Sequence, residues 1–324
     1  MFVGHEFAAF ALAVAGARWA GKNEDTALVV GLLAGASAFL PDLDLLVGTL
    51  AYASVVTGGT TASWEGLWSV SNAVHRGLSH TFLGALGGAI LLTSTAIGRR
   101  SWSEGDRWSA SGAATVGGTV VVGLLAVAIA AGGATEAFSI ALVASGAVVL
   151  GAVSVAETEL TRGEILAGSA AGFLAHPLGD VFLAAPPQFL YPLDHVLLTE
   201  TVEFAADPTL NLLAIALVEV CTVWAGVLAY ASVSRRSVRR ALDPRALVGL
   251  AYPLPMAFVP TPTMVDAHWL GVTLVPTGAI GLLARPPAGA TTRERAFHVL
   301  VTGLATISLA SLAYGLVLLI PFGY

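Results

Sequence analysis

The sequence predicts an all-α fold, a polytopic bundle of about eight to ten membrane-spanning helices. Hydrophobic residues make up 56% of the 324 residues, charged residues only 11%, and the mean hydropathy is +0.80. This composition excludes a soluble globular protein. No basic face of useful size is present, so we expect membrane lipid and no nucleic acid as a partner. The single cysteine, Cys221, lies in an apolar run and excludes a disulfide framework.

The predicted spans follow from long runs that contain few charges. Residues 1–20 lack the positive start of a signal peptide and carry His5 and Glu6, so we interpret them as a retained helix. Residues 27–50 are interrupted only by Pro41-Asp42-Leu43-Asp44. Further spans are predicted at residues 81–97, 112–131, 137–156, 164–184, 209–233 and 296–320. Residues 246–284 contain five prolines and predict two short broken helices or a re-entrant hairpin.

Clusters of arginine give the orientation of these spans. By the positive-inside rule, loops rich in arginine face the cytoplasm. The loops at residues 132–136 and 185–208 contain acidic residues but no lysine or arginine, so they are predicted to be extracytoplasmic. The arginines that define the cytoplasmic side are Arg99, Arg100 and Arg107, then Arg235, Arg236, Arg239, Arg240 and Arg245, and finally Arg285, Arg293 and Arg295.

Four polar motifs project to a similar depth, near the extracytoplasmic face. They are His5, the sequence PDLD at 41–44, HRGLSH at 75–80 and HPLGD at 176–180. Imidazoles and carboxylates inside membrane spans are costly and usually mark a functional site. The residues predicted to bind a metal are His5, Asp42, Asp44, His75, His80, His176 and Asp180.

The spacing within the motifs constrains how each could bind. His176 and Asp180 are four residues apart, which puts them on one face of a helix. Asp42 and Asp44 are two apart, so either Pro41 marks an irregular turn or one aspartate ligates while the other orients a histidine. The five-residue spacing within HRGLSH suits a turn, with Ser79 as a possible N-cap of the next helix.

These residue types predict hydrolytic chemistry at a divalent metal ion. Imidazole and carboxylate ligands match zinc best and also admit manganese or iron. We expect Asp44, Arg76 and His80 to be the catalytic residues, with Asp44 as proton acceptor and Arg76 holding a phosphate oxygen. A site at headgroup depth suits a lipid or lipid-linked phosphoester as substrate.

The four motifs, followed by Pro186-Pro187-Gln188-Phe189-Leu190-Tyr191-Pro192, also carry a family resemblance. They resemble the LexA-regulated, inner-membrane, metal-dependent hydrolase family over roughly the first 200 residues. The resemblance implies a multi-pass hydrolase of unestablished substrate. Residues 1–208 would form its membrane-embedded core, and residues 209–324 would add C-terminal transmembrane helices. The order of the ligands is also similar to that of zinc-dependent phospholipases C, without implying a common fold.

Two alternatives remain beside a membrane-bound hydrolase at the outer membrane face. The same ligands could belong to a transition-metal transporter, which the proline-broken segment at residues 246–284 would suit. They could also form a structural metal site in a membrane protein without catalytic activity. Hydrolysis of a lipid ester would favour the enzyme, and metal uptake into liposomes would favour the transporter.

Overall fold

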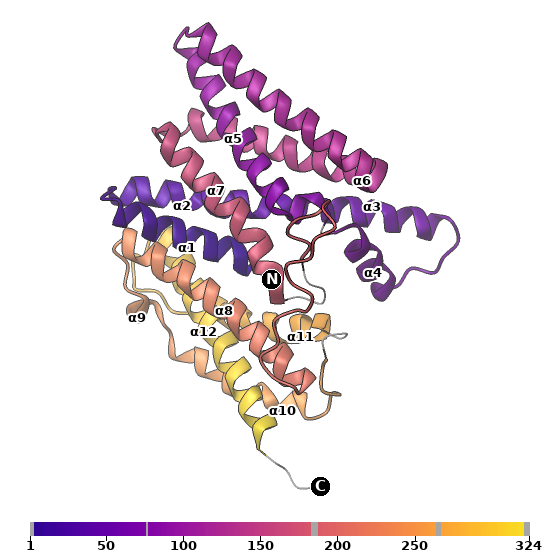
Figure 1. Ribbon diagram of the computed structural model, residues 1–324. Helices are drawn as coiled ribbons and strands as arrows, with labels where there is room; N and C mark the ends of the chain where they lie inside the picture. The colour runs from indigo at the N-terminus through magenta and orange to yellow at the C-terminus, as the bar shows by residue number, and fades with distance from the viewer. Residues whose placement is uncertain (1–2, 76, 183–186, 264–266, 321–324) are drawn as a thin grey trace. The chain divides into compact units, whose positions relative to one another are not determined.

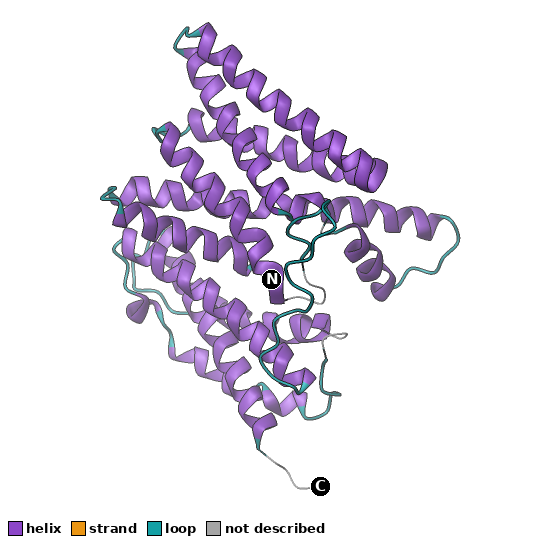
Figure 2. Cartoon of the chain, in the orientation of Figure 1, coloured by secondary structure: helices purple, strands orange, loops and turns teal. Residues whose placement is uncertain are grey.

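The computed structural model is built from helices joined by turns and loops (Figures 1 and 2). It describes residues 3–75, 77–182, 187–263 and 267–320, and no strand occurs among them. Six helices in these ranges are long and apolar enough to cross a membrane. The predicted all-α, multi-span fold is therefore confirmed.

Long α-helices and shorter 3-10 helices make up most of the described chain. In chain order, the α-helices are α1 (Gly4–Trp19), α2 (Glu24–Phe39), α3 (Asp44–Thr57), α4 (Trp64–Val74), α5 (Phe82–Ser103), α6 (Arg107–Ala156), α7 (Arg162–Gly179), α8 (Pro208–Val233), α9 (Val238–Ala241), α10 (Pro253–Met256), α11 (Ala267–Leu274) and α12 (Thr292–Leu319). The 3-10 helices are η1 (Leu40–Leu43), η2 (Leu78–His80), η3 (Asp180–Phe182), η4 (Pro244–Ala251) and η5 (Val275–Leu283).

The chain divides into two compact units. The first is Ala8–Thr201, and the second is Val202–Tyr324 together with Phe2–Phe7. The division predicted between residues 208 and 209 lies at the beginning of α8.

In the first unit, α2, η1 and α3 follow one another without a loop. The Asn23 side chain accepts a hydrogen bond from the Thr26 N–H at 2.7 Å and so caps α2. Pro41 has no N–H to donate and interrupts the α-helical hydrogen bonds, and the chain tightens into η1 over Leu40–Leu43. The helix resumes as α3 at Asp44. The predicted interruption at PDLD is thus one 3-10 turn inside a continuous helical rod.

The long helix α6 consists of two arms joined at Gly133. Gly133 has φ 70° and ψ −153°, a backbone conformation open to glycine, and the helix folds back there (Figure 1). The two arms contain the predicted spans 112–131 and 137–156. Counting the two arms separately raises the six candidate spans among the described residues to seven. The helix α1, also predicted as a span, has 16 residues and is shorter than these. The predicted eight to ten spans were therefore too many, because α1 is short and residues 246–284 form only short helices in their described part.

Close approach of helices through small residues builds the core of the first unit. α7 packs against α2 and α5, and α5 packs against α6. A Cβ on Gly172 of α7 would lie 2.2 Å from the Ala34 carbonyl oxygen of α2, so these two backbones nearly touch. Phe173, next along α7, is almost fully buried in the apolar core. This packing fixes the end of α7, which carries His176, against the end of α2.

In the second unit, α12 packs against α8 and against the broken segment formed by η4, α10, α11 and η5. Where two short broken helices or a re-entrant hairpin were predicted at residues 246–284, the described part of that segment forms these four short helices. Glu219 of α8 has a structural role here, because its Oε1 atom accepts hydrogen bonds from the Val3 and Gly4 N–H groups at 2.6 and 3.1 Å. It thereby satisfies free donors at the start of α1.

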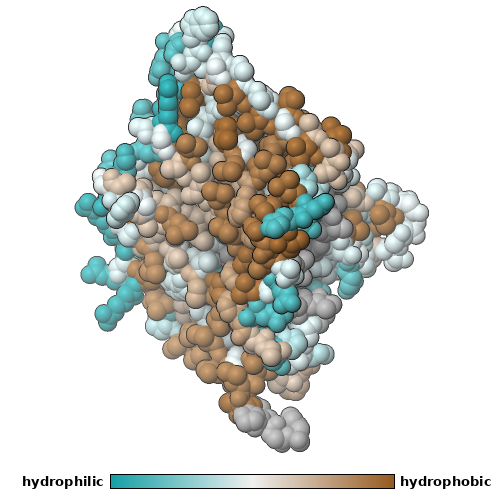
Figure 3. All heavy atoms as spheres, viewed as in Figure 1, coloured by the Kyte–Doolittle hydropathy of each residue, from teal (hydrophilic) through white to brown (hydrophobic). Residues whose placement is uncertain are grey.

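The surface has the distribution expected for a membrane protein. Apolar residues cover much of the face shown in Figure 3 (brown), and hydrophilic residues (teal) gather near the edge where the α1–α2 and α5–α6 connections of the first unit lie. The α5–α6 connection carries Arg100 and Arg107 near its two ends. Apolar and hydrophilic residues are separated in this way when the flanks of helices face hydrocarbon and their ends face water.

Candidate metal centre

Three buried elements of the first unit bring histidine and aspartate side chains together. They are η1 with the start of α3, η2 just before α5, and the end of α7 with the start of η3. Thr81 caps α5 by accepting the Gly84 N–H at 3.0 Å. The expected N-cap, Ser79, was therefore wrong, and its hydroxyl donates instead to Asp44 Oδ2 at 2.9 Å. The cap and this hydrogen bond fix the turn that carries His80.

Asp42 lies at the centre of three imidazoles. Its Oδ1 atom is 3.8 Å from His75 Nε2, 3.7 Å from His80 Nε2 and 3.6 Å from His176 Nε2. The His80 ring contacts the other two edge to face, with centroids 4.2 Å from His75 and 4.5 Å from His176. The same nitrogen of each ring, Nε2, thus turns toward one carboxylate oxygen.

Asp180 completes the cluster from the other side. Its Oδ2 atom is 3.8 Å from His80 Nε2 and 3.7 Å from His176 Nε2. His176 and Asp180 lie on one face at the end of α7, as their spacing predicted, and both are nearly inaccessible to solvent. Asp42, with a side chain 14% exposed, is the most accessible of these residues. Water or a ligand would therefore reach the cluster past Asp42 and His75.

Asp44 holds two of the imidazoles by their other nitrogen. Its Oδ1 atom is 2.8 Å from His75 Nδ1, and its Oδ2 atom is 3.2 Å from His80 Nδ1. An ionised carboxylate only accepts hydrogen bonds, so both rings donate from Nδ1. In the neutral ring, Nε2 then carries the lone pair that a metal requires. This arrangement corresponds to the alternative in which one aspartate of PDLD orients histidines.

His176 is held in the same way by the backbone. Its Nδ1 atom lies 2.7 Å from the Ala38 carbonyl oxygen at the end of α2. A carbonyl oxygen is also acceptor-only, so His176 donates from Nδ1 and turns Nε2 toward Asp42 and Asp180. All three imidazoles of the cluster therefore adopt the same tautomer, for two different structural reasons.

The distances between the imidazole nitrogens and the carboxylate oxygens fit residues that share a metal ion better than residues that are hydrogen-bonded to one another. The five distances from Nε2 atoms to Asp42 Oδ1 and Asp180 Oδ2 run from 3.6 to 3.8 Å, longer than hydrogen bonds. Two ligand atoms at about 2.1 Å from a tetrahedral zinc ion would lie about 3.4 Å apart. Two groups that could hold an ion occur in the first unit, Asp42, His75 and His80, and His80, His176 and Asp180. The donor set thus fits a divalent cation after small movements.

The charge of the cluster also favours a bound cation. Asp42, Asp44 and Asp180 are carboxylates within a largely apolar helix bundle, and Asp44 and Asp180 are almost fully buried. Buried charges in proteins are paired or coordinate a metal, because isolated ones cost several kcal/mol. A bound divalent cation would offset most of this negative charge.

A comparison with known families places the chain in the membrane. The family model of the YdjM inner membrane protein matches residues 1–242. The chain belongs to the YdjM inner membrane protein family. The match includes every element that contributes to the cluster and continues through α8 and α9. Comparisons with curated proteins and with solved structures found no match.

One residue of this YdjM-family chain that the sequence did not single out is Glu136. It follows the Gly133 turn of α6, and its Oε1 atom accepts a hydrogen bond from the Leu78 N–H at the start of η2. A Cβ on Gly77 would collide with the Glu136 carboxylate, so Gly77 is needed for this approach. Glu136 therefore positions the HRGLSH turn from outside the motif. Its place in a predicted loop without lysine or arginine was visible in the sequence, but its partner was not.

The segment after α7 also supports the turn. The Phe82 N–H donates to the Phe189 carbonyl oxygen at 2.9 Å, and the two rings stack with centroids 4.8 Å apart. Tyr191 packs against the apolar cluster around Leu78, where burial and the Glu136 carboxylate raise the pKa of its hydroxyl. Pro186, the first residue of the predicted PPQFLYP motif, lies outside the described residues.

Two predicted site residues cannot be placed in the cluster. Arg76 lies outside the described residues. His5 is buried in the first turn of α1, with Nε2 3.5 Å from Glu6 Oε1, and this turn belongs to the second unit. The metal-binding role of His5 and the substrate-binding role of Arg76 therefore stay predictions. The other six predicted residues meet in the first unit: Asp42, Asp44, His75, His80, His176 and Asp180.

Proposed function

We propose that this YdjM-family protein is a membrane-embedded, metal-dependent hydrolase. The observation that carries the proposal is the common direction of His75, His80 and His176. Each presents Nε2 to Asp42 Oδ1 within 3.8 Å while an acceptor-only group engages Nδ1. Metal-binding histidines have this arrangement of ligand nitrogen and orienting partner.

The residues divide by the atoms that they present. Asp42, His75, His80, His176 and Asp180 would hold the ion, and zinc suits them best, with manganese or iron as alternatives. Asp44 would orient His75 and His80. Its oxygens already accept hydrogen bonds from His75 and Ser79, and Oδ2 lies 3.2 Å from His80 Nδ1. The proton-accepting role expected from the sequence therefore does not suit it. A divalent ion held here would make water nucleophilic near neutral pH and polarise a phosphoryl oxygen.

The substrate class follows from the position of the cluster in the chain. The N-terminal end of α5 lies beside the cluster, and the other end of α5 carries Arg100. The positive-inside rule therefore supports a site near the extracytoplasmic face, at headgroup depth. Arg76, between two cluster residues in sequence, supplies a charge suited to a phosphate. We propose a lipid or lipid-linked phosphoester as substrate; LexA regulation, implied by the resemblance, stays a prediction.

The test is lipid hydrolysis by the purified, zinc-loaded protein in phospholipid nanodiscs. Release of a water-soluble phosphorylated headgroup is expected from the wild type and not from Asp42→Asn, whose amide is a poor metal ligand. Asp194→Asn, a change at an exposed loop residue, is the matched control and should retain activity. Zinc uptake into sealed liposomes without any lipid turnover would contradict the proposal and favour the transporter.

A further inference from the structure

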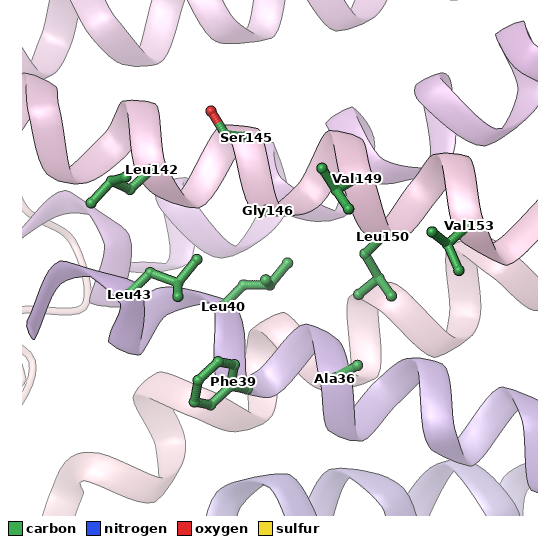
Figure 4. Close-up of a pocket in the computed structure, with 10 residues that line it drawn as sticks. All are labelled: Ala36, Phe39, Leu40, Leu43, Leu142, Ser145, Gly146, Val149, Leu150 and Val153. Carbon is green, nitrogen blue, oxygen red and sulfur yellow. The ribbon is translucent and has the colours of Figure 1, made fainter. Parts of the chain in front are cut away.

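The first unit carries an apolar groove that begins beside the cluster. It has a volume of about 600 Å³ and lies between α2 with η1 on one side and the second arm of α6 on the other (Figure 4). Both walls belong to helices long and apolar enough to cross a membrane. The groove therefore faces hydrocarbon and must be filled by apolar chains, since an empty groove would lose dispersion contacts.

The walls are two stripes that run antiparallel to each other. Leu142, Val149 and Val153 line the α6 side. Figure 4 shows Leu142 facing Leu43 at one end and Leu150 above Ala36 toward the other end, where Val153 lies. The eleven-residue separation of Leu142 and Val153 gives a length of about 16 Å. The Ser145 hydroxyl donates to the Ala141 carbonyl oxygen at 2.7 Å. The groove wall thus presents no unsatisfied hydroxyl and is effectively apolar.

The 3-10 helix η1 joins this groove to the candidate metal centre. Residues three apart in a 3-10 helix eclipse one another, so Leu40 and Leu43 share a face. Both line the groove, and both would contact a Cβ on Gly146 of α6. Asp42, between them in sequence, leaves that face and points to the three imidazoles. One turn of helix thus has a hydrocarbon side and a metal-binding side.

We propose that the groove is the acyl-chain subsite of the substrate lipid. It rests on the proposed function: the headgroup lies at the histidine–aspartate cluster, and one acyl chain extends from the Leu43 end of the groove toward the Val153 end. Lipid chains are as apolar as the groove, so burial alone gives no preference over the bilayer. The preference comes from the headgroup, which anchors the chain at the Leu43 end.

Two matched substitutions on α6 test this subsite. Val149→Trp fills the groove, whereas Val122→Trp places the same bulk on the first arm, away from it. Val149 and Val122 are 63% and 68% exposed, so neither change disturbs a tightly packed core. Fluorescence-detected size-exclusion chromatography would confirm that both variants fold.

The readout is photolabelling in vesicles of phosphatidylethanolamine and phosphatidylglycerol. A trace of phosphatidylethanolamine carries a diazirine near the end of one acyl chain, and mass spectrometry locates the label. We expect peptides covering residues 36–43 and 142–153 to carry more label than peptides around Val122. Labelling of residues 36–43 should fall several-fold in Val149→Trp and stay at the wild-type level in Val122→Trp. Equal labelling in both variants, or labelling no higher than around Val122, would overturn the subsite.

The same samples separate this result from the proposed function. Metal content and headgroup release are measured before the sample is irradiated, so that crosslinking by the probe affects neither value. A protein without metal or turnover would overturn the proposed function, and with it the assignment of the bound chain to a substrate. A metal-loaded, active protein whose groove is not labelled would overturn the subsite alone.

Discussion

The Asp44 carboxylate accepts a hydrogen bond from His75 Nδ1 at 2.8 Å, across 31 residues of sequence. This bond joins the PDLD and HRGLSH motifs through an orienting contact. With the parallel contact from Asp44 to His80, it fixes the direction in which both rings present Nε2. The difference between Asp42 and Asp44 is therefore one of role, and mutations should separate the two.

Asp44→Asn should weaken metal binding without abolishing it. An asparagine offers one acceptor and one amide donor, so one of the two imidazole N–H groups would lose its partner. Loss of such an orienting partner lowers metal affinity by about 10- to 100-fold. Competition with a fluorescent chelator measures the change, with Asp194→Asn as the control. An unchanged affinity would contradict the orienting role.

Glu136 should act on the site through the backbone of Leu78. Glu136→Gln keeps an oxygen that can accept the Leu78 N–H, whereas Glu136→Ala leaves this donor without its acceptor. A lost acceptor at a buried group costs about 1–3 kcal/mol. We expect a lower Tm and weaker metal binding for the alanine variant, and values near wild type for the glutamine variant. If both variants behave alike, the carboxylate has another role.

Gly172→Ala should separate α7 from α2. The added methyl group would lie 2.2 Å from the Ala34 carbonyl oxygen, a backbone atom that cannot rotate away. Overpacking of this kind costs about 1–3 kcal/mol. It should also move His176 away from Asp42, so the Tm and the metal content should both fall. Gly163→Ala on the same helix meets open space and is the matched control; an equal loss in both variants would contradict the account.

Metal removal should destabilise the folded protein. A ligand that binds the native state at a free concentration of 100 times its Kd stabilises it by about 2.7 kcal/mol. Prolonged dialysis against a chelator should therefore lower the Tm, and added zinc should restore it. In Asp42→Asn, the Tm should no longer respond to either treatment. A wild-type Tm that is indifferent to chelator would mean that no structural or catalytic ion contributes to stability.

The features that depend on short-range spacing could be predicted from the sequence. The helical register of His176 and Asp180, the break at PDLD and the reversal near Gly133 all follow from local chemistry, and the structure has all three. The predicted N-cap of α5 was wrong by two residues because Ser79 and Thr81 are both favoured N-cap residues. Ser79 is instead engaged by Asp44, a contact that only the tertiary fold creates.

The remaining features depend on contacts between distant segments. The i, i+2 spacing of Asp42 and Asp44 left their roles open. The roles differ because Asp42 approaches Nε2 of His75 and His80, whereas Asp44 approaches Nδ1 of both rings. The link from Glu136 to Leu78 runs through a backbone N–H, which leaves no pattern in the side-chain sequence. The groove likewise depends on how α6 lies against α2 and η1.

The most direct test of the metal centre is elemental analysis of the detergent-purified protein. Wild type, Asp42→Asn and His80→Ala are compared with the Asp194→Asn control after equilibration with zinc and removal of free metal. We expect about one or two zinc ions per chain in the wild type and the control. Asp42→Asn and His80→Ala should retain only a small fraction of this metal while eluting as folded protein. Equal zinc content in all four proteins, or none in the wild type, would contradict the account.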